Sequence, residues 1–223
     1  MVLSTDNQIK QNVEKSINRD GRVDASDLRV EVTDGVVTLT GTVSSYTAYW
    51  AAHDDAMLAN DVVRVVVAMK VLFPPSHSVP SDEEIEIAAN SVLGWSADLD
   101  PKAIRASVED GVVTLEGYVP WFWHREKAGD MVSALRGVTE VRNKTIVTPT
   151  QQVEDNLIAE DINGELERAR LLDDSKVQVE VKDGVVTLKG KVGVSLSSWR
   201  AERTARTALG VRDVKNQLSV KYL

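Results

Sequence analysis

The hexapeptide DGVVTL occurs three times in this chain, at residues 34–39, 110–115 and 183–188. In each copy one further residue separates the leucine from a glycine, giving the pattern DGVVTLxG. The copies begin 76 and 73 residues apart, which indicates three structural units of about 70 residues each. A unit of this size buries only a small core, so contacts with neighbouring units or with an outside partner are expected.

Each copy is preceded by apolar residues spaced four apart, which is typical of one face of an amphipathic helix. These residues are Ile9, Val13 and Ile17, then Ile85, Ala89 and Leu93, and finally Ile158, Ile162 and Leu166. Thr5 with Gln8, and Ser81 with Glu84, match the capping box that begins many helices, and the third unit lacks this pattern.

Apolar and polar residues alternate on both sides of each Asp-Gly pair, as in VQVEVKDGVVTLKGKV, which is the pattern of half-buried strands. Asp-Gly between two such runs predicts a tight hairpin, because both central residues of a type I′ turn need positive φ. We therefore interpret Asp34, Asp110 and Asp183 as turn residues and not as catalytic carboxylates. The glycines that end the three blocks predict a bulge or a close backbone approach.

A second helix with a stripe of small apolar residues follows each hairpin, and a β-rich run closes each unit. The stripes are Ala52, Ala56 and Ala59, then Ala128, Val132 and Leu135, and finally Ala201, Ala205 and Ala208. A strand that follows a crossover helix is expected to pair in parallel. The predicted fold class is α+β, with three tandem αββαβ domains at residues 1–73, 80–148 and 152–223. Each is a small three-stranded mixed sheet with two helices packed on one face.

Each unit resembles a BON domain, the bacterial osmotic-shock and nodulation module. The resemblance lies in the DGVVTLxG block, in the valine of GTV, GYV and GKV, and in the closing GVTEVRN and GVRDVKN. It covers nearly the whole chain and implies a leaderless protein of three tandem BON domains. The family further implies an absence of catalytic activity, a link to osmotic or envelope stress, and possible binding of phospholipid.

Composition argues against several other classes of function. The net charge of −8 does not favour nucleic-acid binding, and the absence of cysteine excludes disulfides and thiolate metal sites. The three histidines have no shared ligand pattern, and no glycine-rich phosphate loop is present. We therefore expect no enzyme, no metal and no cofactor.

The chain as given begins without a basic leader or an apolar run, which is the pattern of a cytoplasmic protein. A periplasmic location is expected only if a leader has been removed. No segment approaches the ~20 apolar residues that span a bilayer.

Aromatic residues gather where the second strand of each unit leads into the second helix. They include Trp50 in the first unit, Trp121, Phe122 and Trp123 in the second, and Trp199 in the third. Trp50 and Trp199 align, and each lies about 200° around its helix from the alanine stripe. A tryptophan facing away from its own core needs another surface to cover it, which is another unit, a second copy or a lipid headgroup region.

Arg203 and Arg206 follow Trp199 by four and seven residues and therefore lie on its side of the helix. Aromatic and basic residues together are typical of a peripheral site for anionic phospholipid. The sequence thus predicts a binding protein that associates with a membrane surface. The alternative is a structural or chaperone-like stress protein that acts through a protein partner or through homo-oligomers, with its tryptophans packed between units.

Overall fold

The computed structural model describes residues 5–75, 78–150, 152–169, 176–193 and 195–220, so one of the three histidines, His77, lies outside it. The first unit consists of α1 (Asp6–Arg19), β1 (Leu28–Thr33), β2 (Val36–Val43), α2 (Tyr46–Met57) and β3 (Arg64–Val71). The second consists of α3 (Asp82–Trp95), β4 (Ile104–Glu109), β5 (Val112–Val119), α4 (Phe122–Ser133), β6 (Glu140–Asn143) and β7 (Ile146–Val147). The third consists of α5 (Asp155–Arg168), β8 (Lys176–Lys182), β9 (Val185–Val192), α6 (Ser195–Thr207) and β10 (Asp213–Val220).

The sheet of each unit is mixed, as predicted. The middle strands β2, β5 and β9 pair antiparallel with the strand before them in the chain and parallel with the last strand. In the second unit the last strand is divided into β6 and β7, which both pair with β5. The prediction of three αββαβ domains in an α+β fold is confirmed.

The repeated Asp-Gly pairs form the predicted hairpin turns. Asp34 and Gly35 both have positive φ, at 50° and 70°, and the other two pairs have nearly the same values. The turn is held by a carboxylate that sequence analysis missed: Asp6 of α1 accepts hydrogen bonds from the backbone N–H of Asp34 and of Gly35, at 3.0 and 2.9 Å. Asp82 and Asp155 do the same in their units. Each of these aspartates lies 28 residues before the aspartate of its turn, and this repeated spacing could have predicted the contact.

The glycines after the first two DGVVTL blocks, Gly41 and Gly117, mark a close backbone approach. A Cβ on Gly117 would lie 1.9 Å from the carbonyl oxygen of Ala103, and one on Gly41 would lie 2.0 Å from that of Asp27. Since no side chain tolerates such distances, glycine is required where the hairpin bends over the loop before it.

The predicted apolar faces make the core of each unit. The residues spaced four apart in α1, α3 and α5 are buried, and so are the first two residues of each stripe in the second helices. The small side chains of the stripe allow these helices to lie close to the sheet. Both capping boxes are present, whereas Glu154 begins α5 without a side-chain cap.

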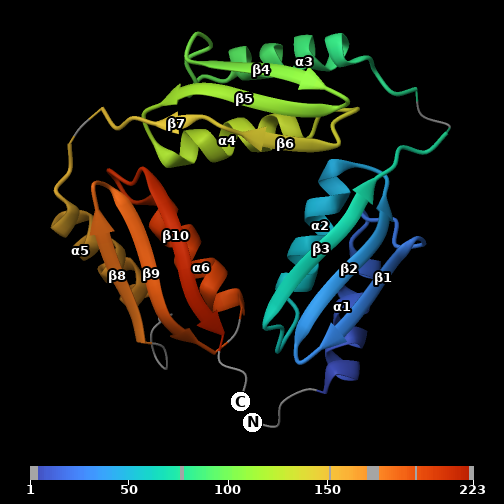
Figure 1. The fold of residues 1–223 in the computed structure, drawn as a ribbon, viewed down its shortest axis with the longest axis horizontal. Coiled ribbons are helices and arrows are strands. Elements are labelled where there is room, and N and C mark those ends of the chain that lie inside the picture. The colour runs from blue at the N-terminus through green and yellow to red at the C-terminus, as the bar shows by residue number, and fades with distance from the viewer. Residues whose placement is uncertain (1–4, 76–77, 151, 170–175, 194, 221–223) are drawn as a thin grey trace.

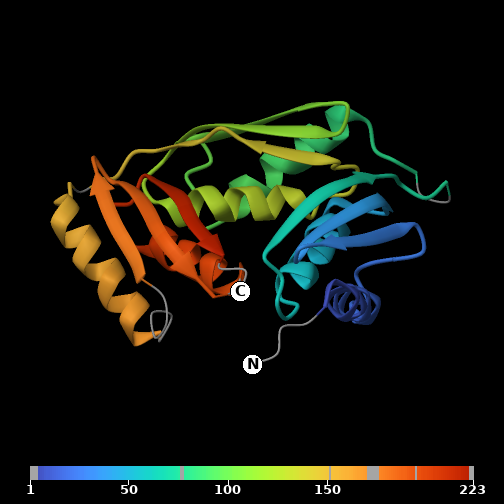
Figure 2. The ribbon, with the colours of Figure 1, turned by 60° about the horizontal axis from the view of Figure 1, so that its bottom comes forward.

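The three units surround a common centre (Figure 1). Their second helices α2, α4 and α6 lie towards this centre, whereas the first helices α1, α3 and α5 lie further out (Figure 2). The start of each second helix, where the aromatic residues gather in the sequence, therefore lies where the units meet (Figure 1).

Candidate functional site

The first residue of each second helix is buried by a neighbouring unit. Tyr46, Phe122 and Ser195 occupy the same aligned position, twelve residues after the turn aspartate, and are 9%, 7% and 3% exposed. Tyr46 belongs to the apolar core of the second unit. The Arg206 guanidinium of the third unit lies 5.4 Å from the centre of the Phe122 ring.

Ser195 of the third unit contacts the first unit. Its backbone N–H donates to the carbonyl oxygen of Val62 at 3.2 Å, and its hydroxyl lies 3.6 Å from the sulfur of Met57. The first unit is thus covered by the second, the second by the third and the third by the first. Three aligned positions close the units into a ring.

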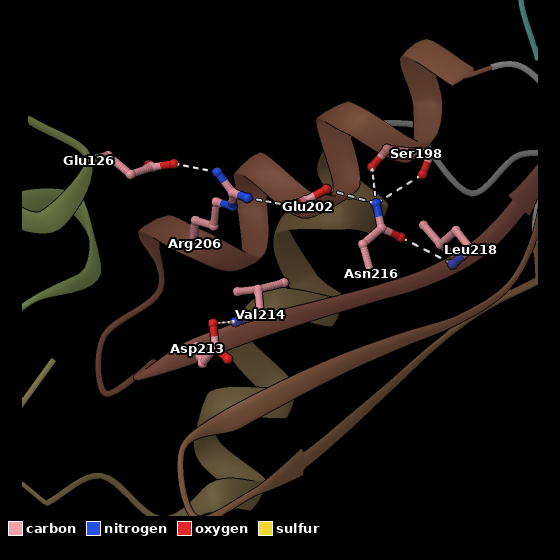
Figure 3. A network of polar contacts seen from close by, with 8 residues as sticks. All are labelled: Glu126, Ser198, Glu202, Arg206, Asp213, Val214, Asn216 and Leu218. Carbon is pink, nitrogen blue, oxygen red and sulfur yellow. Dashed lines mark hydrogen bonds and ion pairs between the residues drawn. The ribbon is translucent and has the colours of Figure 1, made fainter. Parts of the chain in front are cut away.

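Arg206 is the main polar link within this ring (Figure 3). One guanidinium nitrogen lies 2.5 Å from a carboxylate oxygen of Glu126 in α4, and another pairs with Glu202 one turn earlier in α6. Glu202 also accepts from the side-chain amide of Asn216 in β10, at 2.9 Å. Glu126 stands at the aligned position that Trp50 and Trp199 occupy in the other units, so the second unit places a carboxylate there.

The predicted aromatic residues differ in their surroundings. Trp50 is 45% exposed and meets the rings of Tyr46, Tyr49 and His53 edge-on. Trp123 is 39% exposed and stacks on His124, with Lys127 at 5.9 Å from its ring centre.

Trp121 is the half-buried residue that precedes α4, and Phe122 is buried between units. Contacts between units thus include those of Tyr46, Phe122, Ser195 and Arg206. Trp50 and Trp123 remain exposed to solvent, and Trp199 is half-buried.

Trp199 and Arg203 lie together on one face of α6, as their spacing predicts. The Arg203 guanidinium is 5.3 Å from the ring centre of Trp199, within the range of a cation–π contact. Arg203 itself is exposed. Of the two predicted arginines, Arg203 is exposed beside the tryptophan, whereas Arg206 forms an ion pair with Glu126 of α4.

The aligned position of Arg203 carries an acid in both other units, Asp54 in α2 and Asp130 in α4. Partial burial of its carboxyl group raises the pKa of Asp130, and so does the charge of Glu126, while the positive charge of Arg203 lowers it. Opposite charges at equivalent positions thus favour the approach of α6 to α4.

Two further residues were missed by sequence reasoning. Arg200 and Thr204 line an open hollow beside Arg203, and their spacing along α6 was the available signal. Trp95 at the end of α3 is 89% exposed and lies apart from the other aromatic residues in the sequence, so it is not part of this site.

Two features considered above are absent from the residues that the structure describes. No helix among them has the length and apolar character needed to cross a bilayer. Within the same residues, no three His, Asp or Glu side chains are grouped so that they could hold a metal ion.

Comparison with known proteins identifies relatives. The BON domain model matches residues 5–72, 81–149 and 154–222. Osmotically-inducible protein Y of Escherichia coli strain K12 is 28% identical over 202 residues, which are 87% of this chain and 98% of that protein.

Two solved structures are also similar over most of their length. CdsD, a structural protein of the type III secretion system of Chlamydia trachomatis, is 18% identical with a TM-score of 0.27, covering 95% of this chain and 91% of that one. The PrgH periplasmic domain is 10% identical with a TM-score of 0.21, covering 88% and 95%. TM-scores this low carry no argument about the present chain. The three family matches cover nearly all of its length, and the chain therefore belongs to the BON domain family, with three domains in tandem.

Proposed function

We propose that the protein is a non-catalytic binding protein that attaches to anionic phospholipid surfaces through the face of α6 that carries Trp199 and Arg203. The observation that carries the proposal is the pair of Trp199 and Arg203, which places an exposed cation beside an aromatic ring. In the part of the chain that the structure describes, no carboxylate forms an ion pair with Arg203. A tryptophan has an apolar body and a polar N–H, and favours the headgroup region of a bilayer.

The net charge of the third unit favours membrane attachment through this unit over attachment through the first or the second. Residues 150–223 carry twelve basic and twelve acidic side chains, whereas the first two units are net acidic. In the second unit the comparable cation, Lys127, is paired with Asp98, and in the first unit the residue four positions after Trp50 is Asp54. An anionic surface is thus repelled least by the third unit.

Arg206 has a different role from Arg203 in this proposal. Its charge is matched by Glu126 and Glu202, and its side chain is about one-third exposed. It supports membrane attachment only indirectly, by holding α6 against α4.

The relationship to an osmotically-inducible protein supports a role in osmotic stress. Osmotic stress alters the volume enclosed by a membrane and the ionic strength at its surface. A protein attached to that surface by a few charged contacts responds to both, because surface electrostatics weaken as salt rises.

Vesicle co-sedimentation tests the proposal. The protein should sediment with phosphatidylcholine vesicles that contain phosphatidylglycerol, and should remain in solution with phosphatidylcholine alone. Each basic residue near an anionic surface contributes about 1 kcal/mol, so Arg203→Glu should weaken binding by about tenfold or more. Trp199→Ala should also weaken it.

Matched controls are Trp95→Ala, which removes the most exposed tryptophan, and Arg105→Glu, which reverses an exposed charge in β4. Equal losses in the controls would mean that binding is not localised to α6. Failure of the wild-type protein to bind at low salt would overturn the proposal.

A second candidate is a structural stress protein that acts through protein contacts, and the surroundings of Trp50 favour it. Trp50 is exposed within an aromatic cluster that has no neighbouring cation at the position of Arg203. Tryptophan is enriched in protein interfaces. Sedimentation velocity tests this candidate: association that rises with concentration and is lost in Trp50→Ala, with vesicle binding absent, would favour it over the membrane.

A further inference from the structure

The face of α6 that carries Trp199 and Arg203 continues into an open hollow between α5 and α6. Its volume is about 420 Å³, and its lining residues are Ala169, Arg200, Arg203, Thr204 and Thr207. The four residues from α6 are separated by three, four and seven positions, and such spacings bring side chains onto one face of a helix. Two guanidinium groups and two hydroxyl groups therefore share one surface.

The positive charge of the hollow is only partly offset within the described ranges of the chain, because Asp130 of α4 interacts with Arg203 without forming an ion pair. Neither Arg200 nor Arg203 has an ion pair there, in contrast to Arg206. Like charges three positions apart on a helix repel each other, so a bound anion would relieve an unfavourable interaction. The end of α5 at Ala169 contributes only about half a negative charge from its carbonyl groups, against two full positive charges.

Of the two hydroxyl groups, one already donates a hydrogen bond within α6 and the other does not. The Thr207 hydroxyl donates to the backbone carbonyl oxygen of Thr204 at 2.9 Å. The hydroxyl of Thr204 has no hydrogen bond to any described residue. The donors that face the hollow are therefore the two guanidinium groups and the Thr204 hydroxyl.

We propose that this hollow binds a single phosphate group, held by Arg200 and Arg203 and by the hydroxyl of Thr204. Arginine presents N–H groups in a planar fork that matches two oxygens of a phosphate. The inference rests on the proposed function, because the hollow shares Arg203 with the membrane-binding face. A phosphate monoester carries about 1.5 to 2 negative charges near neutral pH, so it should bind more tightly than a singly charged diester.

The phosphate could belong to a lipid headgroup or be free in solution, and the experiment separates these sources. Binding of the intact protein is measured to phosphatidylcholine vesicles that contain phosphatidic acid, a monoester, or phosphatidylglycerol, a diester, at matched surface charge. Inorganic phosphate is then added as a competitor, with sodium chloride at the same ionic strength as the control. Binding of inorganic phosphate alone is followed by the NMR signals of the arginine side chains.

The informative variants are Thr204→Val, which removes a hydroxyl from a side chain of similar shape, and Arg200→Gln. Lys215→Gln is the control, because it removes one exposed positive charge from β10 in the same unit. Hydrogen bonds to charged groups are among the stronger ones, and we expect Thr204→Val to weaken binding to the monoester vesicles about tenfold. Its binding to the diester vesicles should change less than about twofold, and Lys215→Gln should lower both equally.

The possible outcomes distinguish the two proposals. Displacement by inorganic phosphate supports the hollow as a site for free phosphate, whereas monoester selectivity without displacement supports the lipid headgroup. Equal binding of the two anionic vesicle types, unchanged by Thr204→Val, would overturn the hollow and leave membrane attachment intact. Phosphate binding without vesicle binding would overturn membrane attachment alone. Absence of both would overturn both.

Discussion

The guanidinium group of Arg206 in α6 lies 2.5 Å from the Glu126 carboxylate and 5.4 Å from the centre of the Phe122 ring, both of which belong to α4. One side chain of the third domain thus makes an ionic and an aromatic contact with the second. The pairing of Arg206 with Glu126 could not be predicted from the sequence, because 80 residues separate them in the chain.

Arg206→Met should lower the free energy of unfolding by about 1 kcal/mol, because the ion pair is about one-third exposed and is partly screened by water. Methionine keeps the apolar contact with Phe122 and removes the charge. A double-mutant cycle with Glu126→Gln, measured by urea denaturation, should give a coupling of ~0.5–1 kcal/mol that decreases with salt. The exposed pair of Arg168 and Glu165 within α5 is the control and should couple less strongly. Zero coupling between Arg206 and Glu126 would contradict the ionic link.

Ser195→Leu should separate the third domain from the first. The side chain is 3% exposed and faces Met57, so extra methyl groups have no space and overpacking of this kind costs about 1–3 kcal/mol. Small-angle X-ray scattering should show a larger radius of gyration than in the wild-type protein. Ser91→Leu, at an exposed position of α3, should leave the radius unchanged. A compact Ser195→Leu protein of normal stability would argue against ring closure at this point.

His124 should make the second domain less stable as the pH falls. Burial lowers the pKa of His124, and the Nδ1 atom has no hydrogen-bond partner among the described residues. The unfolded state therefore binds a proton at a higher pH than the folded state, and stability is lost as the pH falls through the unfolded pKa of about 6.5. The urea midpoint should decrease between about pH 7.5 and pH 5, and His124→Gln should flatten this dependence. The control His53→Gln retains His124 and should keep the slope; a flat wild-type profile would contradict the prediction.

Asp82→Ala should destabilise the hairpin of the second domain. Its carboxylate accepts from the backbone N–H of Asp110 and Gly111 at 2.8 and 2.9 Å, and unpaired donors cost about 1–3 kcal/mol when they are shielded from water. Thermal unfolding should show a lower midpoint than for Glu83→Ala, which removes an acid from the same first turn of α3 without touching the hairpin. Similar midpoints for the two variants would assign the effect of Asp82 to the helix alone.

Most of the fold within one domain could be predicted, because the signals are local. Alternation around Asp-Gly predicts paired strands and their turn, and residues spaced four apart predict the buried face of α1, α3 and α5. The shared face of Trp199 and Arg203 follows from helix geometry alone. The split of the last strand into β6 and β7 was not predicted, since the sequence around Asn143 and Thr145 has the same β-rich character as the other closing strands.

The surroundings of the candidate site were less predictable. Trp199, Arg203 and Arg206 share a side of one helix in sequence, yet the packing of α4 against α6 gives the two arginines different partners. Glu126 pairs with Arg206 because the domains close into a ring, and the direction of closure depends on contacts at Tyr46, Phe122 and Ser195. The hollow at Arg200 and Thr204 likewise forms only when α5 lies beside α6.

The sequence by itself determined that there are three domains, how each one folds and which side of each second helix faces its own core, because turn chemistry and hydrophobic periodicity act over a few residues. The tertiary structure decided which of the remaining charged and aromatic side chains meet a neighbouring domain and which face solvent. That choice depends on contacts between residues more than 75 positions apart, where burial and charge complementarity between separate domains outweigh local preference. Arg206 became a link between domains, and Arg203 remained available beside Trp199.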